Sequence, residues 1–89
     1  MRKVKWVIVK SYYKNRRFIR RELYGYSDKL KNCTQMLRGY KSIVLNKQEP
    51  FLKDAERVTG HYNRAGLDVR GDNDKLIEFR IHSVNIFLL

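Results

Sequence analysis

A cluster of four turn-forming residues, Gly71-Asp72-Asn73-Asp74, separates two short apolar-containing runs in the last quarter of the chain. Glycine, asparagine and aspartate tolerate positive φ, and the two polar types also hydrogen-bond their own backbone, so such clusters mark turns. The flanking segments, Leu67 to Arg70 and Lys75 to Ile81, have the length and apolar content of strands. We therefore predict a C-terminal β-hairpin, which commits the fold to an antiparallel sheet.

A second hairpin is predicted at the N-terminus. Residues Val4 to Lys10 are rich in Val, Ile and Trp and indicate a strand. Residues Arg17 to Tyr26 alternate with period two, which places Phe18, Arg20, Glu22, Tyr24 and Tyr26 on one side of a second strand. The connection, Ser11 to Arg16, is about six residues long and lacks an Asn-Gly turn signal, so we expect Asn15 to turn the chain.

A first helix is predicted after Ser27, which suits an N-cap and precedes Asp28, an acid favoured by the helix dipole. Apolar residues then recur at helical intervals: Leu30, Cys33, Leu37 and Tyr40. We expect this helix to fray near Gly39. The following β-branched run, Ser42 to Leu45, predicts a third strand or a buried connector.

A second helix of about three turns is predicted from Pro50 to about Gly60, because proline suits the first helical turn. The apolar residues of this segment have helical spacing: Phe51, Leu52, Ala55, Val58 and Tyr62.

In the C-terminal strand the alternating apolar residues stand at odd positions up to Ile81 and at even positions from Val84. A bulge at His82-Ser83 would keep both sets on one face, so we predict a bulge there. The apolar segment Val84 to Leu89 is expected to be either a central strand or a dimer contact. Both a monomer and a homodimer are compatible with the sequence.

These elements predict an α+β fold: one antiparallel sheet, built from the N-terminal and C-terminal hairpins and packed with two helices. With 89 residues, the chain is expected to form a single domain over residues 1–89. A chain this short buries only about 60–65% of its unfolded surface, which leaves little room for a deep substrate cavity. We predict a binding protein and not an enzyme, with no catalytic residues.

No metal or cofactor site is predicted. The single cysteine, Cys33, excludes an intramolecular disulfide and is expected to be a buried apolar residue. His61 and His82 lack ligand spacing to it. Four acids of the C-terminal hairpin could in principle hold Mg²⁺ for phosphodiester cleavage, but turn and surface roles account for them: Asp68, Asp72, Asp74 and Glu78.

The chain has no segment that suggests export or membrane insertion. The apolar run after the basic N-terminus, Trp6 to Val9, is too short for a signal peptide. The apolar run Ile86 to Leu89 is far below the roughly 20 residues that span a bilayer. With one cysteine, these features lead us to expect a cytoplasmic protein without a membrane partner.

The formal net charge of +11 is concentrated in one half of the chain. Residues 1–47 hold 14 Lys and Arg against 2 Asp and Glu, whereas residues 48–89 hold 6 against 7. Such self-repulsion costs stability, and a polyanionic partner would relieve it. A simpler hypothesis, that the charge serves solubility alone, stays open.

The segment from Lys10 to Arg21, KSYYKNRRFIRR, holds six basic residues, three aromatic residues and no acid. Basic side chains neutralise phosphates, and exposed aromatic rings stack on unpaired bases, so the mixture favours nucleic acid, DNA or RNA. No known nucleic-acid-binding motif is present. The residues predicted to bind are Lys10, Tyr12, Tyr13, Lys14, Arg16, Arg17, Arg20 and Arg21.

Two alternatives remain for this segment. Arginine and tyrosine are also typical anchors of protein interfaces, so the chain could be an inhibitor or adaptor, of the kind phages and mobile elements encode, that docks on an acidic partner. In the structural alternative, Phe18 and Ile19 belong to the core and the arginines are a solvated face.

Overall fold

The computed structural model describes the backbone of residues 2–45 and 48–87 and the side chains of residues 5–43 and 48–84. The described chain contains five strands, β1 to β5, one α-helix, α1, and one 3₁₀ turn, η1. Their bounds are β1 Arg2–Lys14, β2 Arg17–Ser27, α1 Leu30–Leu45, η1 Pro50–Leu52, β3 Val58–Asn63, β4 Gly66–Gly71 and β5 Lys75–Phe87. The strands form one antiparallel sheet in the order β2-β1-β5-β4-β3.

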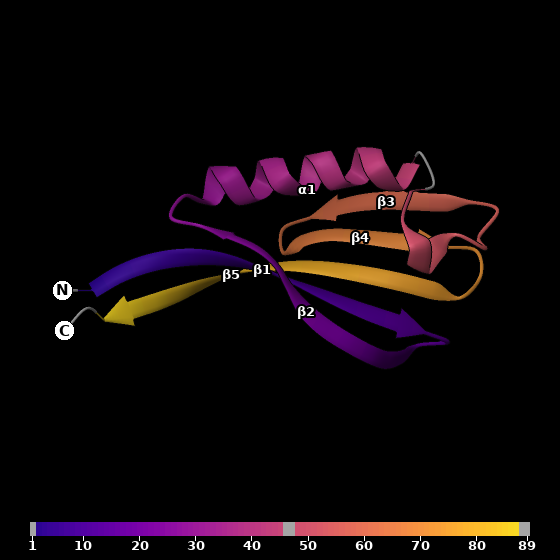
Figure 1. The fold of residues 1–89 in the computed structure, drawn as a ribbon, viewed down its shortest axis with the longest axis horizontal. Coiled ribbons are helices and arrows are strands. Elements are labelled where there is room, and N and C mark those ends of the chain that lie inside the picture. Colours follow the sequence, from indigo (N-terminus) through magenta and orange to yellow (C-terminus); the bar gives the residue numbers. More distant parts are fainter. Residues whose placement is uncertain (1, 46–47, 88–89) are drawn as a thin grey trace.

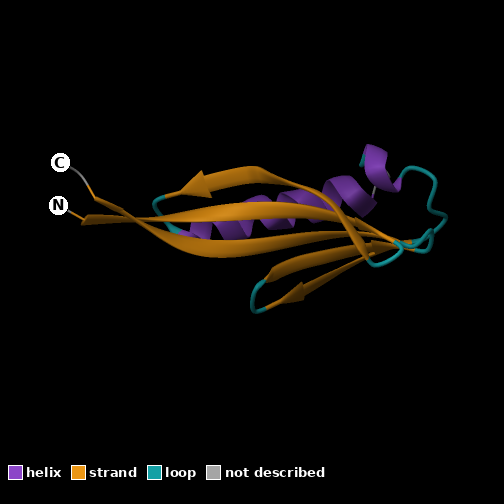
Figure 2. Cartoon of the chain, turned by 90° about the horizontal axis from the view of Figure 1, so that it is seen from below, coloured by secondary structure: helices purple, strands orange, loops and turns teal. Residues whose placement is uncertain are grey.

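The helix α1 lies along one face of the sheet (Figure 1), and no described helix covers the other face, which we call the open face (Figure 2). Strand residues alternate between the two faces. The helix-side residues of β1, β4 and β5 and the inner stripe of α1 form the buried core: Ile8, Tyr12, Cys33, Leu37, Tyr40, Leu67, Val69, Ile77 and Phe79, with Leu52 from η1.

The central strands are much longer than the helix that covers them. A strand of 13 residues, such as β1 or β5, extends about 44 Å, whereas the 16 residues of α1 span about 24 Å. The turn η1 covers a further part of the helix side, where Phe51 packs edge-on against Tyr12 with ring centroids 4.9 Å apart. The 3₁₀ turn after α1 thus extends the cover of the helix side around Tyr12.

The first helix is longer than predicted. It continues through Gly39 to Leu45, so the expected strand or connector at Ser42 to Leu45 is wrong. Gly39 lies on the outer side of α1, where no atom approaches its missing Cβ within 4 Å. A glycine inside a helix costs only about 1 kcal/mol, which the buried stripe offsets. Ser27 ends β2, and its hydroxyl accepts a hydrogen bond from the Lys29 amide at 3.2 Å.

The second predicted helix is wrong: only η1 is helical, and Val58 to Asn63 form β3. Val58 and Tyr62 are four residues apart, a spacing that fits one face of a helix and equally one face of a strand. The Asp72 carboxylate accepts hydrogen bonds from the Glu56 and Arg57 amides, at 2.9 and 3.1 Å, just before β3 begins. The α+β class and the antiparallel sheet are confirmed, with one helix in place of two.

The N-terminal hairpin turns over two residues and not six. Asn15 and Arg16 both have positive φ, 52° and 65°, and Lys14 already pairs with Arg17. Asn15 does turn the chain, as predicted. The C-terminal hairpin is also confirmed as β4 and β5.

The bulge predicted at His82-Ser83 is wrong, because β5 pairs with β1 in unbroken register from Lys75 to Phe87. Val84 therefore faces away from Ile77 and Phe79. The register shifts occur between β1 and β2, at Ile8/Val9 and at Tyr12/Tyr13. In the segment Val84 to Leu89, the backbone to Phe87 belongs to β5, and the last two residues lie outside the described chain.

Two glycines give opposite expectations for alanine substitution. Gly66 has a φ of 155°, and a Cβ there would lie 2.0 Å from the Phe79 carbonyl oxygen. We expect Gly66→Ala to lower the free energy of unfolding by about 2 kcal/mol or more, because both strain and a clash arise. Gly39→Ala is the control, expected to raise it by roughly 0.5–1 kcal/mol. Urea denaturation measures both, and an unchanged midpoint for Gly66→Ala would contradict the register of β4 and β5.

Candidate nucleic-acid interface

The predicted binding segment forms the end of β1, the turn and the start of β2, and the sheet divides its residues between two faces. Lys10 and Tyr12 point to the helix side and are buried, with 6% and 2% of their surface exposed. Tyr13 lies on the open face, and Arg16 lies in the turn itself. The segment is therefore not one continuous binding surface.

Lys10 lies at the centre of the buried helix side. Its Nζ is 3.4 Å from Glu49 Oε2, and the Tyr40 hydroxyl donates to the same oxygen. Four ring centroids surround the ammonium group, those of Tyr12, Tyr24, Tyr40 and Phe79 at 4.9, 5.8, 4.8 and 5.7 Å. Cation–π attraction strengthens where water is excluded, so this cluster is structural and leaves neither Lys10 nor Tyr12 on the surface.

Burial and the hydrogen bond to Glu49 raise the pKa of the Tyr40 hydroxyl far above its ordinary value. Tyr40 therefore stays protonated and remains a donor to the carboxylate. A second hydroxyl, that of Tyr12, donates to Glu22 Oε1 at 2.6 Å. Glu22 Oε1 lies 3.9 Å from Lys10 Nζ, so Glu22 and Glu49 each contact both a tyrosine hydroxyl and the ammonium group.

The open face carries an aromatic pair, Tyr13 and Phe18, whose ring centroids are 5.8 Å apart at 75°. Phe18 is 53% exposed, so it is not a core residue. The guanidinium of Arg21 lies 5.2 Å from the Phe18 ring, and its Nε donates to Ser11 Oγ at 3.0 Å. This arrangement offers a flat exposed ring with a cation beside it.

The register shift in β2 creates this pair. Phe18 and Arg21 are three residues apart and would face opposite sides of a regular strand. Because Tyr12 pairs with Arg20 while Tyr13 pairs with Phe18, Ile19 is the extra residue, and Phe18 and Arg21 share the open face. The predicted alternation places Phe18 and Tyr26 on the same side of β2 as Arg20, and this is wrong. The shift at Tyr12/Tyr13 moves Phe18 to the open face, and the shift at Ile8/Val9 does the same for Tyr26.

Three further cations of the segment, Lys14, Arg16 and Arg17, are exposed. Among the described side chains, no carboxylate lies within 4 Å of the basic groups of Lys14, Arg16 or Arg17. Lys14 pairs in register with Arg17 on one side and with Lys75 on the other. Like charges at paired positions repel each other and destabilise a sheet, and an anionic partner would reduce this repulsion.

Arg20 lies on the helix side of the sheet, because it pairs with Tyr12. Its guanidinium lies 4.3 Å from the centroid of the Tyr12 ring, at the rim of the helix-side cluster. It remains exposed, so Arg20 can contact a partner that reaches around the edge strand β2.

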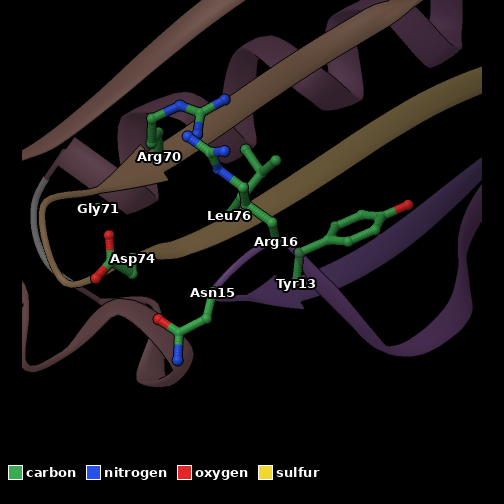
Figure 3. Close-up of a pocket in the computed structure, with 7 residues that line it drawn as sticks. All are labelled: Tyr13, Asn15, Arg16, Arg70, Gly71, Asp74 and Leu76. Carbon is green, nitrogen blue, oxygen red and sulfur yellow. The ribbon is translucent and has the colours of Figure 1, made fainter.

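Sequence reasoning missed Arg70, which β4 brings to the same end of the open face. Arg70 and Arg16 line one open pocket of about 730 Å³ together with Tyr13, Asn15, Gly71, Asp74 and Leu76 (Figure 3). No local signal marks Arg70, because it belongs to the half of the chain with balanced charge. Only the pairing of the two hairpins through β1 and β5 reveals it.

Three of the four acids of the C-terminal hairpin have structural partners for their carboxylates, and Asp74 lines the pocket. The Arg80 guanidinium binds Asp68 and Glu78 at 2.7 and 3.0 Å, and Asp72 accepts two backbone amides before β3. Across the described residues, no group of three potential ligands gathers that could hold a metal ion. Cys33 is buried, and burial raises the pKa of its thiol.

Comparison with protein-family models, curated proteins and solved structures finds no match to this chain. Over the residues described, no helix is long and apolar enough to cross a membrane.

The Lys10–Glu49 pair yields a stability prediction. Glu49→Gln removes the closer of the two carboxylates that pair with the buried ammonium and leaves only Glu22, whose Oε1 lies 3.9 Å from Nζ, so we expect the free energy of unfolding to fall by about 3 kcal/mol. Lys10→Met/Glu49→Gln removes both charges and is expected to lose less than that. Urea denaturation measures these two losses and that of Lys10→Met alone. A double variant that loses as much as Lys10→Met and Glu49→Gln together would show that the two groups do not interact.

Proposed function

We propose that the protein binds nucleic acid, DNA or RNA, mainly through phosphate contacts made by the exposed part of the 10–21 segment. The observation that carries the proposal is an aromatic pair with one exposed ring, Phe18, and Arg21 beside it. Three exposed cations that no described carboxylate neutralises lie in the same hairpin end: Lys14, Arg16 and Arg17. The contacting residues are Tyr13, Lys14, Arg16, Arg17, Phe18, Arg20 and Arg21, with Arg70 from β4.

The aromatic pair favours single strands over duplexes. Base-to-aromatic stacking contributes about 1–3 kcal/mol per base and needs an unpaired base face. Phe18 offers such a ring on the open face, next to Arg21, which can reach the adjoining phosphate. Phosphate contacts position the strand without reading its sequence, so we expect little sequence preference.

A protein partner is the second candidate, supported by the edge strand β2. This strand has no neighbour on its outer side in the sheet. It exposes Ile19, Leu23 and Tyr26 to 47%, 61% and 59%. Free strand edges with apolar side chains can bind another strand, and the adjacent arginines would favour an acidic one.

A pull-down from lysate, with and without nuclease, separates the two candidates. Leu23→Ser should leave nucleic-acid binding intact if the phosphate contacts dominate. If nuclease changes nothing and Leu23→Ser removes the captured protein, the nucleic-acid proposal fails.

Salt dependence tests the phosphate contacts. Six cations on a single strand give a slope of about −4.2 in log affinity against log salt, which is roughly a 300-fold loss from 50 to 200 mM. Arg16→Ala/Arg17→Ala should flatten the slope by about 1.4 on every sequence. Arg38→Ala/Arg64→Ala removes the same charge at the second, smaller pocket beside α1 and should leave the slope nearly unchanged. Fluorescence anisotropy at several salt concentrations measures the slope for the unchanged protein and for both double variants. An Arg16→Ala/Arg17→Ala slope equal to that of the unchanged protein would contradict the assigned contacts.

Stacking is tested separately from charge. Phe18→Ala removes an exposed ring, so we expect a roughly tenfold loss of affinity for a single strand and little change for a duplex of the same length. Tyr62→Ala is the matched control, because Tyr62 is an exposed aromatic residue of β3 that packs under Lys41 on the helix side. Equal losses on single and double strands would argue against stacking at Phe18.

A further inference from the structure

The pocket at the end of the open face joins the tips of both hairpins. The Asn15 amide donates to the Asp74 carbonyl at 2.8 Å, which holds the β1–β2 turn against the β4–β5 turn. Arg16 comes from the first turn and Arg70 from the end of β4. This backbone hydrogen bond ties the turn that carries Arg16 to the hairpin that carries Arg70, although the two arginines are far apart in the sequence.

Both guanidinium groups point into this pocket (Figure 3). Neither forms an ion pair with any acid among the described side chains. One acid lines the pocket, Asp74, and Figure 3 shows its carboxylate at the opposite side from the two guanidinium groups. The pocket therefore has a cationic side with two unused planar donor groups.

The chemistry of two arginines favours a phosphate monoester over a phosphodiester. Each guanidinium presents five N–H donors in a fork that matches two oxygens of a phosphate. A phosphodiester within a strand has one charge, whereas a terminal phosphate carries about −1.5 to −2 at pH 7 and three free oxygens. Two adjacent guanidinium groups match the second species in charge and in donor number.

The size and the wall of the pocket fit a nucleotide at a strand end. Ligand pockets usually have about 300–1,000 Å³, and the volume here is about 730 Å³. The Tyr13 ring forms one wall and leads to Phe18, its partner in the aromatic pair. With the terminal base stacked on Tyr13, the next nucleotide of the strand would lie next to Phe18 and Arg21.

We propose that this pocket binds the terminal phosphate of a nucleic-acid strand, with Arg16 and Arg70 holding the phosphate and Tyr13 the terminal base. The inference rests on the proposed function, because it names the part of the strand that the open face receives. It makes the protein a binder of phosphorylated strand ends.

The test compares three oligothymidylates of ten nucleotides that carry a 5′-phosphate, a 3′-phosphate or hydroxyls at both ends. We expect one phosphorylated form to bind roughly tenfold more tightly than the hydroxyl form at pH 7.5. Arg70→Ala should remove this preference, so that the phosphorylated and hydroxyl forms bind the variant with equal affinity. Arg64→Ala, an equal loss of charge in the β3–β4 turn, should keep the preference. Circular dichroism confirms the fold of each variant.

Lowering the pH gives an independent readout. The second ionisation of a phosphate monoester has a pKa of about 6, so the preference should shrink between pH 7.5 and pH 5 as the dianion gains a proton. Binding of all three oligonucleotides with equal affinity would overturn the terminal-phosphate inference and leave the proposed function standing. Failure of all three to bind would overturn the proposed function itself.

Discussion

The buried ammonium group of Lys10 is the interaction on which the rest of this structure depends. It brings together β1, the Tyr40 end of α1 and the Glu49 carboxylate that precedes η1. A buried charge is costly unless it is paired, and here a carboxylate and four aromatic rings surround it. The cluster therefore fixes where the helix and the 3₁₀ turn dock, and it commits the chain to a core on one face of the sheet.

A core on one face leaves the other face free for contacts. One helix of about 24 Å cannot cover both sides of strands that extend about 44 Å. The open face therefore combines apolar, aromatic and basic side chains, and most acids of the chain are already engaged elsewhere. Asp54, Asp68 and Glu78 pair with cations of the C-terminal half, and none of the described carboxylates lies within 4 Å of the basic groups of Lys14, Arg16 or Arg17.

The sequence predicts the sheet and its two hairpins because alternation and turn chemistry are local signals. It fails at Val58 and Tyr62, where a four-residue spacing satisfies a helix and a strand alike, and at Phe18, where a bulge reverses the face. Lys10 looks like a surface cation in the sequence, since nothing local shows that Glu49 will pair with it. Arg70 is missed for the same reason, because it shares a pocket with Arg16 only through the order of the strands in the sheet. Long-range pairing, not composition, decides which predicted residues form the candidate site.

The turn residue Arg16 shows how local strain and the proposed role oppose each other. Its φ of 65° lies in the left-handed region, where a residue with a Cβ pays about 1–2 kcal/mol that glycine avoids. Two-residue turns of this type prefer Asn-Gly, and the chain has Asn-Arg instead. Stability alone favours glycine at this position. An arginine held there extends its cation into the pocket that Arg70 also lines, which is the position that the proposed phosphate contact requires.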